Sequence, residues 1–144
     1  MNTRTFSLVV GIAFLIAGAL GFVPGLVHAP HPGAPDVHVT AGYGYLLGLF
    51  PVNVLHDLVH LLIGIAGLIA SRTLPAAIRF CRTLAVFYGA LALMGLIPAF
   101  RTTFGLIPIF GHDVWLHAVT AAAAAYVGFV AHPTLRQVPT PHQA

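Results

Sequence analysis

Charged side chains are scarce in this chain of 144 residues. Charged residues make up 6% of the sequence, and glutamate and lysine are absent altogether. A soluble domain carries about 25% charged residues, so the composition excludes an ordinary soluble protein. The single cysteine, Cys81, also excludes an intramolecular disulfide and a zinc site built from cysteine pairs.

The motifs of soluble enzymes are missing as well. The chain has no glycine-rich phosphate loop and no nucleophile elbow, and it has only three carboxylate side chains, all from aspartate. The net charge of +3 comes from arginines that flank apolar segments. This charge therefore predicts the orientation of a membrane protein, and it gives no support to nucleic acid as a partner.

Apolar residues dominate the sequence, at 58%, with a mean hydropathy of +0.94. We therefore predict an all-α integral membrane protein, a four-helix bundle whose first partner is the lipid bilayer. Residues 1–135 form this four-span domain, and residues 136–144, which contain two prolines, form a disordered tail. The expected spans are residues 6–27, 54–70, 80–100 and 113–131.

The arginines set the expected orientation. Five of the six, all except Arg101, lie beside the ends of spans that share one side of the membrane. The positive-inside rule assigns that side to the cytoplasm. Both termini are then cytoplasmic, in a multi-pass protein of the cytoplasmic (inner) membrane.

Two segments of the chain resemble each other. GLFPVNVLHDLVH at residues 48–60 aligns without a gap with GLIPIFGHDVWLH at residues 105–117, at an offset of 57. GFVP at 21–24 likewise resembles GLIP at 95–98, at an offset of 74. We therefore predict two parallel two-helix repeats related by an approximate two-fold axis along the membrane normal.

Both repeats carry ionisable side chains at the outer ends of their second helices. Such groups are costly at membrane depth and are a functional hypothesis by default. Helical spacing puts His56 and His60 on one face of span two, and it puts Asp113 and His117 on one face of span four. Asp57 precedes His60 by three residues, which predicts a hydrogen bond between them.

We predict two kinds of ligand for this cluster. A transition metal would use His56, His60 and His117, with Asp57 and Asp113 as ligands or as partners of the other ring nitrogens. A haem would instead be held between His60 and His117. Nitrogens about 4 Å apart would suit a shared ligand, because Zn–N bonds are about 2.0–2.1 Å long.

Other readings of the same residues remain open. The histidines and aspartates could have a purely structural role and simply join helices. Each polar contact of this kind stabilises helix association by about 0.6 kcal/mol. They could also form a proton relay, or a pocket for a lipid or quinone. A transporter would need a polar path, and below His60 and His117 these two spans offer only Thr120 and Tyr126.

The outer loops complete the expected architecture. Residues 28–53 form a connection rich in proline and glycine, with His28, His31 and His38 exposed to solvent or delivering metal. The apolar segments 45–51 and 104–110 are too short to cross a bilayer. We expect them to lie in the interface or to cover the histidines.

The run GYLLGLFPVNVLHDLVHLLIGIAGL, residues 44–68, resembles a bacterial family of small four-helix membrane proteins catalogued as domain of unknown function 4383. The resemblance spans about residues 4–131, and its core is N-x-x-H-x-x-x-H at Asn53, His56 and His60. It implies the four-span fold and a bacterial membrane, and it implies no activity.

The favoured function is a small accessory membrane protein whose His/Asp cluster organises the bundle and binds a transition metal or haem; an enzymatic role is left undecided and is not the favoured one. One alternative is a structural subunit of a larger membrane complex, respiratory or light-harvesting, or of a homo-oligomer, with no ligand of its own. The other is a membrane oxidoreductase or transporter.

Overall fold

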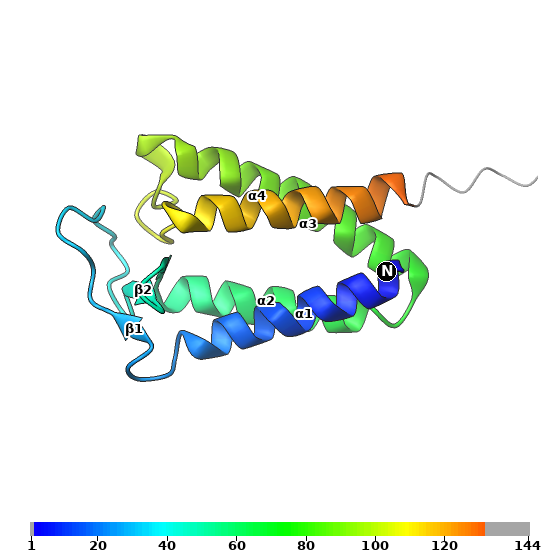
Figure 1. The fold of residues 1–144 in the computed structure, drawn as a ribbon, viewed down its shortest axis with the longest axis horizontal. Helices are drawn as coiled ribbons and strands as arrows, with labels where there is room; N and C mark the ends of the chain where they lie inside the picture. The colour runs from blue at the N-terminus through cyan, green and yellow to red at the C-terminus, as the bar shows by residue number, and fades with distance from the viewer. Residues whose placement is uncertain (1, 132–144) are drawn as a thin grey trace, which may run out of the picture.

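The computed structural model describes residues 2–131 of the chain, in which four long helices run nearly the full length of the molecule (Figure 1). The expected tail at 136–144 lies outside the described residues. Two short helices and three short strands complete the fold. The elements are α1 (Thr3–Leu20), β1 (Val27–His28), β2 (Gly44–Leu46), β3 (Phe50–Val52), α2 (Val54–Ala70), α3 (Leu74–Leu96), the 3₁₀ helix η1 (Pro98–Phe100), α4 (His112–Ala125) and the π-helical turn η2 (Tyr126–Val130).

The predicted helices are present, but both ends of α1 and of α3 differ from the predicted bounds. α2 has the predicted bounds, and α4 with η2 comes within a residue of them. α1 ends at Leu20 rather than at residue 27, before the segment that contains Pro24 and Gly25. α3 begins six residues earlier than predicted, because Thr73 caps it and proline occupies its first turn. It ends before Ile97, whose extended backbone is what a following proline requires.

Three helices are long and apolar enough to cross a membrane: α1, α3, and α4 together with η2. The fourth, α2, is an apolar helix of 17 residues. Large hydrophobic side chains are exposed along all four, among them Ile16, Leu62, Val86 and Val119. An outer surface of this kind fits a lipid environment better than water.

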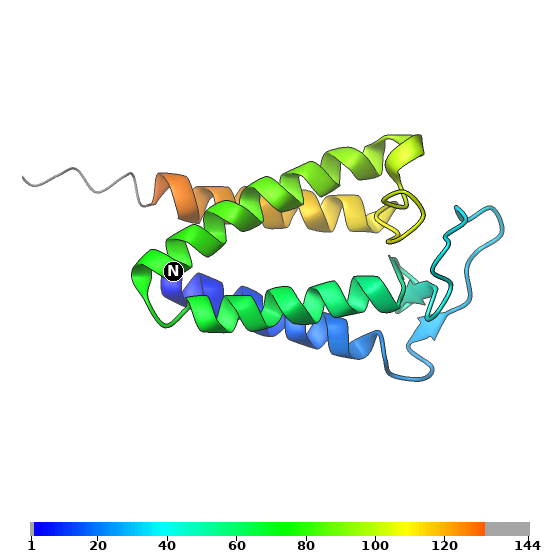
Figure 2. The ribbon, with the colours of Figure 1, turned by 180° about the vertical axis from the view of Figure 1, so that it is seen from behind.

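The helices form two layers. α1 packs along α2, and α3 packs along α4, with the second pair above the first in Figure 1 and the connection from α2 to α3 visible from behind in Figure 2. Glycines allow α1 and α2 to approach closely, since a Cβ atom at Gly11 would lie 2.9 Å from the carbonyl oxygen of Gly64. The Ser7 hydroxyl also donates a hydrogen bond of 2.9 Å to the Gly67 carbonyl.

Corresponding positions of the two pairs face the interior. The buried residues Thr3, Ser7, Gly11, Phe14 and Gly18 of α1 correspond, at the offset of 74, to the buried residues Ala77, Cys81, Ala85, Tyr88 and Ala92 of α3. At the offset of 57, the buried residues His56, Asp57, His60, Gly64, Gly67 and Ala70 of α2 correspond to Asp113, Val114, His117, Ala121, Ala124 and Val127, also buried. The sequence similarity therefore extends to which face of each helix is covered.

A small antiparallel sheet, absent from the all-α expectation, lies at the end of the bundle where α2 and α4 begin (Figure 1). β2 pairs with both β1 and β3, with Tyr45 opposite Pro51. Leu47 and Gly48 turn the chain between β2 and β3 with positive φ angles of 54° and 73°. The strands contain only two or three residues each, so they produce no periodic signal in the sequence.

The rest of the first loop is folded against the bundle end. The His38 amide donates to the Gly105 carbonyl at 2.7 Å, which ties this loop to the α3–α4 connection. The Tyr43 hydroxyl donates to the Pro35 carbonyl at 2.6 Å. Partial burial, together with Tyr45 and Asp36 nearby, raises the pKa of Tyr43, so this hydroxyl keeps its proton well into the alkaline range.

Candidate metal centre

Three histidines meet between the two layers, near the end of the bundle that carries the sheet. His56 and His60 lie one turn apart on α2, and His117 comes from α4. One ring nitrogen from each lies within 4.8 Å of the others. The exposed fractions of the three side chains are 3%, 6% and 2%, respectively, so the cluster is shielded from solvent.

The helix start positions His56. The side chain of Asn53 caps α2 by accepting a hydrogen bond of 3.0 Å from the His56 amide. The Nδ1 atom of His56 lies 3.1 Å from the Pro51 carbonyl oxygen, a partner that only Nδ1–H can satisfy as donor. This carbonyl favours the tautomer with the proton on Nδ1, and the Pro108 carbonyl is a second backbone acceptor beside the same ring. Nε2 is the atom of His56 that faces the cluster.

Asp113 is the fourth member of the cluster. Its Oδ2 atom lies 3.7 Å from Nε2 of His56 and 3.7 Å from Nε2 of His117. These separations exceed the usual hydrogen-bond range of about 2.7–3.2 Å. They are close to the separation of about 3.4 Å expected between two ligands of one tetrahedral ion with bonds of about 2.1 Å. The carboxylate thus lies beside two of the three imidazoles, while the group whose ligand atoms all lie within 4.8 Å of one another consists of the three histidines.

Several buried polar atoms of the cluster have no hydrogen-bond partner among the described residues. They are Nε2 of His60, Nδ1 of His117 and Oδ2 of Asp113. A buried polar atom without a partner costs about 1–3 kcal/mol. Three such atoms in one place indicate a ligand site, to which each imidazole can offer one of its two ring nitrogens.

Two aromatic rings close the site on the side of the bundle core. Phe14 packs against His60 with ring centroids 5.1 Å apart, and Tyr88 packs against His117 at 4.9 Å. The two rings also contact each other, at 5.2 Å. They occupy corresponding positions of α1 and α3. They were not predicted from the sequence, although the offset of 74 pairs Phe14 with Tyr88.

The opposite side of the site is covered by residues 45–51 and 104–110. Of the two placements expected for these segments, in the interface or over the histidines, the second describes this arrangement. The Asn53 amide group donates to the carbonyls of Val39, at 3.0 Å, and Leu106, at 2.7 Å. Pro51, Pro108 and Ile109, which belong to these connections, are fully buried. The cluster therefore lies under a cover of backbone rather than at an open mouth.

The profile of one family, described as "Domain of unknown function (DUF4383)", matches residues 4–130. The chain belongs to this family. No curated protein and no solved structure matches it. Membership confirms the resemblance drawn from residues 44–68, and the family description assigns no activity.

In this DUF4383 protein, Asp57 is buried but does not join the cluster. Its carboxylate lies against Gly21 at the end of α1, and its Oδ1 atom has no hydrogen-bond partner among the described residues. The expected hydrogen bond from Asp57 to His60 is therefore not formed. Residues three apart on a helix diverge by about 60°, so Asp57 points toward α1 while His56 and His60 point toward α4.

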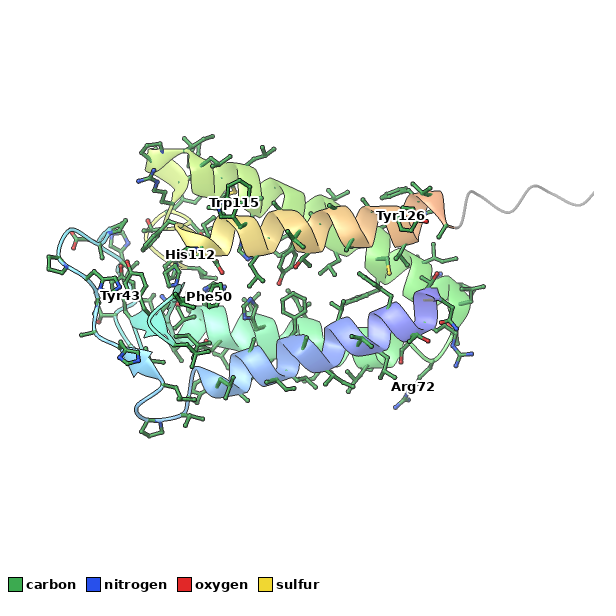
Figure 3. All side chains as sticks on the ribbon, viewed as in Figure 1. Tyr43, Phe50, Arg72, His112, Trp115 and Tyr126 are labelled. Carbon is green, nitrogen blue, oxygen red and sulfur yellow. The ribbon has the colours of Figure 1, made fainter. Side chains whose placement is uncertain are left out.

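The other described histidines lie outside the cluster. His28, His31, His38 and His112 are exposed, and the His31 ring packs on Tyr45 at 4.3 Å. Figure 3 shows His112 near Phe50, at the end of the bundle that carries the sheet. The outer loop therefore adds no imidazole to the group formed by His56, His60 and His117.

The geometry of this DUF4383 protein suits an ion better than a porphyrin. The His56 ring lies 4.5 Å from the His60 ring and 6.2 Å from the His117 ring, measured between centroids. A macrocycle ligated by His60 and His117 would extend through the space that His56, Phe14 and Tyr88 fill around that pair. Four N and O donors at these separations match the coordination of a first-row transition metal instead.

Proposed function

We propose that the protein is an integral membrane protein that binds one divalent transition-metal ion between its two helical pairs. His56, His60 and His117 are the nitrogen ligands, and Asp113 is the fourth ligand. The observation that carries the proposal is the convergence of three buried imidazoles, whose ligand atoms lie within 4.8 Å, with unpartnered polar atoms at the same place.

The ligand set restricts the ion. Neutral imidazoles and one carboxylate favour Zn²⁺, Co²⁺ or Fe²⁺ over Ca²⁺ and Mg²⁺, which prefer oxygen ligands. Four protein ligands and no open position are typical of a structural zinc site. A carboxylate also offsets half of the charge of a divalent ion, which lowers the cost of placing that ion in an apolar interior.

Several features support a membrane location. The apolar lengths of α1, α3 and α4 with η2 suffice for a bilayer. Trp115 and Tyr126 are exposed near the two ends of the last helix (Figure 3), as expected for aromatic residues at both interfaces. Arg4 donates to the Ser71 carbonyl at 2.8 Å, so it lies beside the loop that contains Arg72. By the positive-inside rule this end faces the cytoplasm of a bacterial cell.

The two-repeat architecture is part of the same proposal. The matching buried positions at offsets of 74 and 57 support two copies of a helical pair packed face to face. A site between the copies draws its ligands from both. An ion there would stabilise the association of the pairs, which suits an accessory or structural role in the membrane more than catalysis.

The test is metal analysis of the purified protein in detergent. We expect about one zinc, iron or cobalt ion per chain after loading, and a Co²⁺ form with the intense visible bands of a tetrahedral site. His117→Ala should lose this ion, while His112→Ala, on the same helix but exposed, should keep it. Circular dichroism and gel filtration check that the variants fold, and His117→Gln provides a milder change.

Two results would contradict the proposal. One is a folded, metal-free protein that binds neither Co²⁺ nor Zn²⁺ when these ions are added. The other is metal binding that His117→Ala and His112→Ala weaken equally. Either result would leave the histidines and Asp113 as polar contacts that join helices.

A further inference from the structure

A groove of about 310 Å³ runs along the side of the bundle between α1 and α4. Both helices lie toward the viewer in Figure 1, and α2 and α3 are in front in the view from behind in Figure 2. The walls come from apolar residues of the two helices, including Val10, Ala13 and Ala123, and the groove reaches His60 on α2. It therefore leads from the lipid-facing surface to one of the cluster histidines.

His56 has a hydrogen-bond acceptor for the ring nitrogen that does not face the cluster, and His60 has none among the described residues. A histidine that binds a metal through one nitrogen almost always donates its other N–H to a carboxylate or carbonyl. For His56 this acceptor is the Pro51 carbonyl. Within residues 2–131, no hydrogen bond is formed by His60, whose Nε2 is buried without a partner. If Nε2 binds the ion, Nδ1–H finds no acceptor among the described residues, and a molecule in the groove is the candidate that supplies one.

The walls restrict the chemistry of that molecule. Among the described residues, His60 and Thr120 are the only polar side chains that line the groove, so a charged headgroup would be desolvated without a counter-ion. An acyl chain would fill the groove but would offer no acceptor oxygen. The Phe14 ring, 5.1 Å from the His60 ring and part of the same wall, provides a flat surface for a planar partner.

We propose that the groove binds a membrane quinone, with one ring carbonyl accepting a hydrogen bond from Nδ1 of His60 and the aliphatic tail leaving between α1 and α4 into the bilayer. The inference rests on the proposed function, because Nε2 of His60 must bind the ion for Nδ1 to carry the proton that it donates to the quinone. It assigns binding only, to a neutral, apolar ligand with a carbonyl oxygen.

The test uses the full-length, zinc-loaded protein in nanodiscs of synthetic phosphatidylcholine and decylubiquinone as the probe. Ala123→Phe fills the groove from α4. Its matched control is Ala118→Phe, which enters a separate groove between α3 and α4. We expect about one bound probe per chain in the wild type and in Ala118→Phe, and at least tenfold weaker binding in Ala123→Phe. Nitrogen NMR of labelled histidine should show a shifted Nδ1 resonance of one residue on binding.

The metal content of each sample separates this proposal from the preceding one. Ala123 is exposed and does not belong to the metal cluster, so Ala123→Phe should retain its zinc. If zinc is retained but the probe does not bind, or binds all three proteins equally, the quinone site is wrong and the metal site stands. Phospholipid rather than quinone bound in the groove of the purified protein would also overturn the quinone proposal. If Ala123→Phe does not fold, Ala13→Phe fills the groove from the opposite wall.

Discussion

The side-chain amide of Asn53 donates a hydrogen bond of 2.7 Å to the carbonyl of Leu106, which lies in the connection between α3 and α4. The same amide donates to Val39 in the first loop, and the Oδ1 atom caps α2 through the His56 amide. One side chain thus links both outer connections to the helix that carries two cluster histidines.

Asn53→Ala should destabilise the protein much more than Asn2→Ala. Both residues are N-caps, but Asn2 is exposed and caps only α1. Loss of a cap costs about 1 kcal/mol, and two further hydrogen bonds add about 1 kcal/mol each. We expect about 3 kcal/mol for Asn53 and about 1 kcal/mol for Asn2, measured by denaturant titration in detergent. Equal losses would show that the cover of the site contributes nothing.

Asp113→Asn should weaken metal binding, and Asp57→Asn should not. Asp113 approaches two imidazole nitrogens at 3.7 Å, while Asp57 faces α1. Partners of a metal site typically change affinity by about 10–100-fold, and a direct ligand by at least that much. Competition with a chelator of known affinity measures the difference. Equal affinities for the two variants would remove Asp113 from the site.

Gly21→Ala should destabilise the contact between α1 and α2. An added Cβ atom would overlap the Asp57 carboxylate, whereas the same atom at Gly89 would meet only Ala121 at 3.9 Å. Overpacking costs about 1–3 kcal/mol, and alanine in an open helical position gains about 0.5–1 kcal/mol. The unfolding free energy should therefore fall for Gly21→Ala and hold or rise for Gly89→Ala.

Asp57→Ala supplies the rescue for this pair. In the double variant with Gly21→Ala the overlapping carboxylate is gone. The double variant should therefore lose less unfolding free energy than the sum of the losses in the two single variants. Additive losses would mean that Gly21 and Asp57 do not contact each other in the folded protein.

The proposed orientation can be checked by cysteine labelling in intact cells. Cys81 is fully buried, so the wild type should not react with a membrane-impermeant maleimide. Thr40→Cys, in the exposed outer loop, should react at once, and Arg72→Cys, at the other end of the bundle, should react only after the membrane is permeabilised. The reverse pattern would invert the topology.

Helical periodicity and hydropathy predicted the helices well, but not all of their ends. The apolar run placed the start of span three at residue 80, near Arg79. The Thr73 cap and the following proline began the helix at Leu74, because an arginine outside the apolar core is still compatible with helix. The three-stranded sheet could not be predicted, since its strands are set by pairing among segments of the loop rather than by local pattern.

The cluster was partly predictable for similar reasons. Spacing along α2 put His56 and His60 on one face, and the alignment of the GL-x-P segments put His117 opposite His60. The direction of Asp57 was missed because it depends on Gly21, a residue of another helix, whose missing side chain leaves room for the carboxylate. The packing of the Phe14 and Tyr88 rings against His60 and His117 was not predicted, because a single aromatic residue in an apolar helix does not indicate a binding site.

His56 and Asp113 occupy the same position in the two similar halves of the chain, and they face each other in the interior. A dimer of identical halves could bring together only two bases or only two acids there. When the two halves are joined in one chain, each can be substituted independently, so an acid can face a base in the apolar interior. This freedom to differ across an otherwise matched interface is a physical advantage of one chain over two.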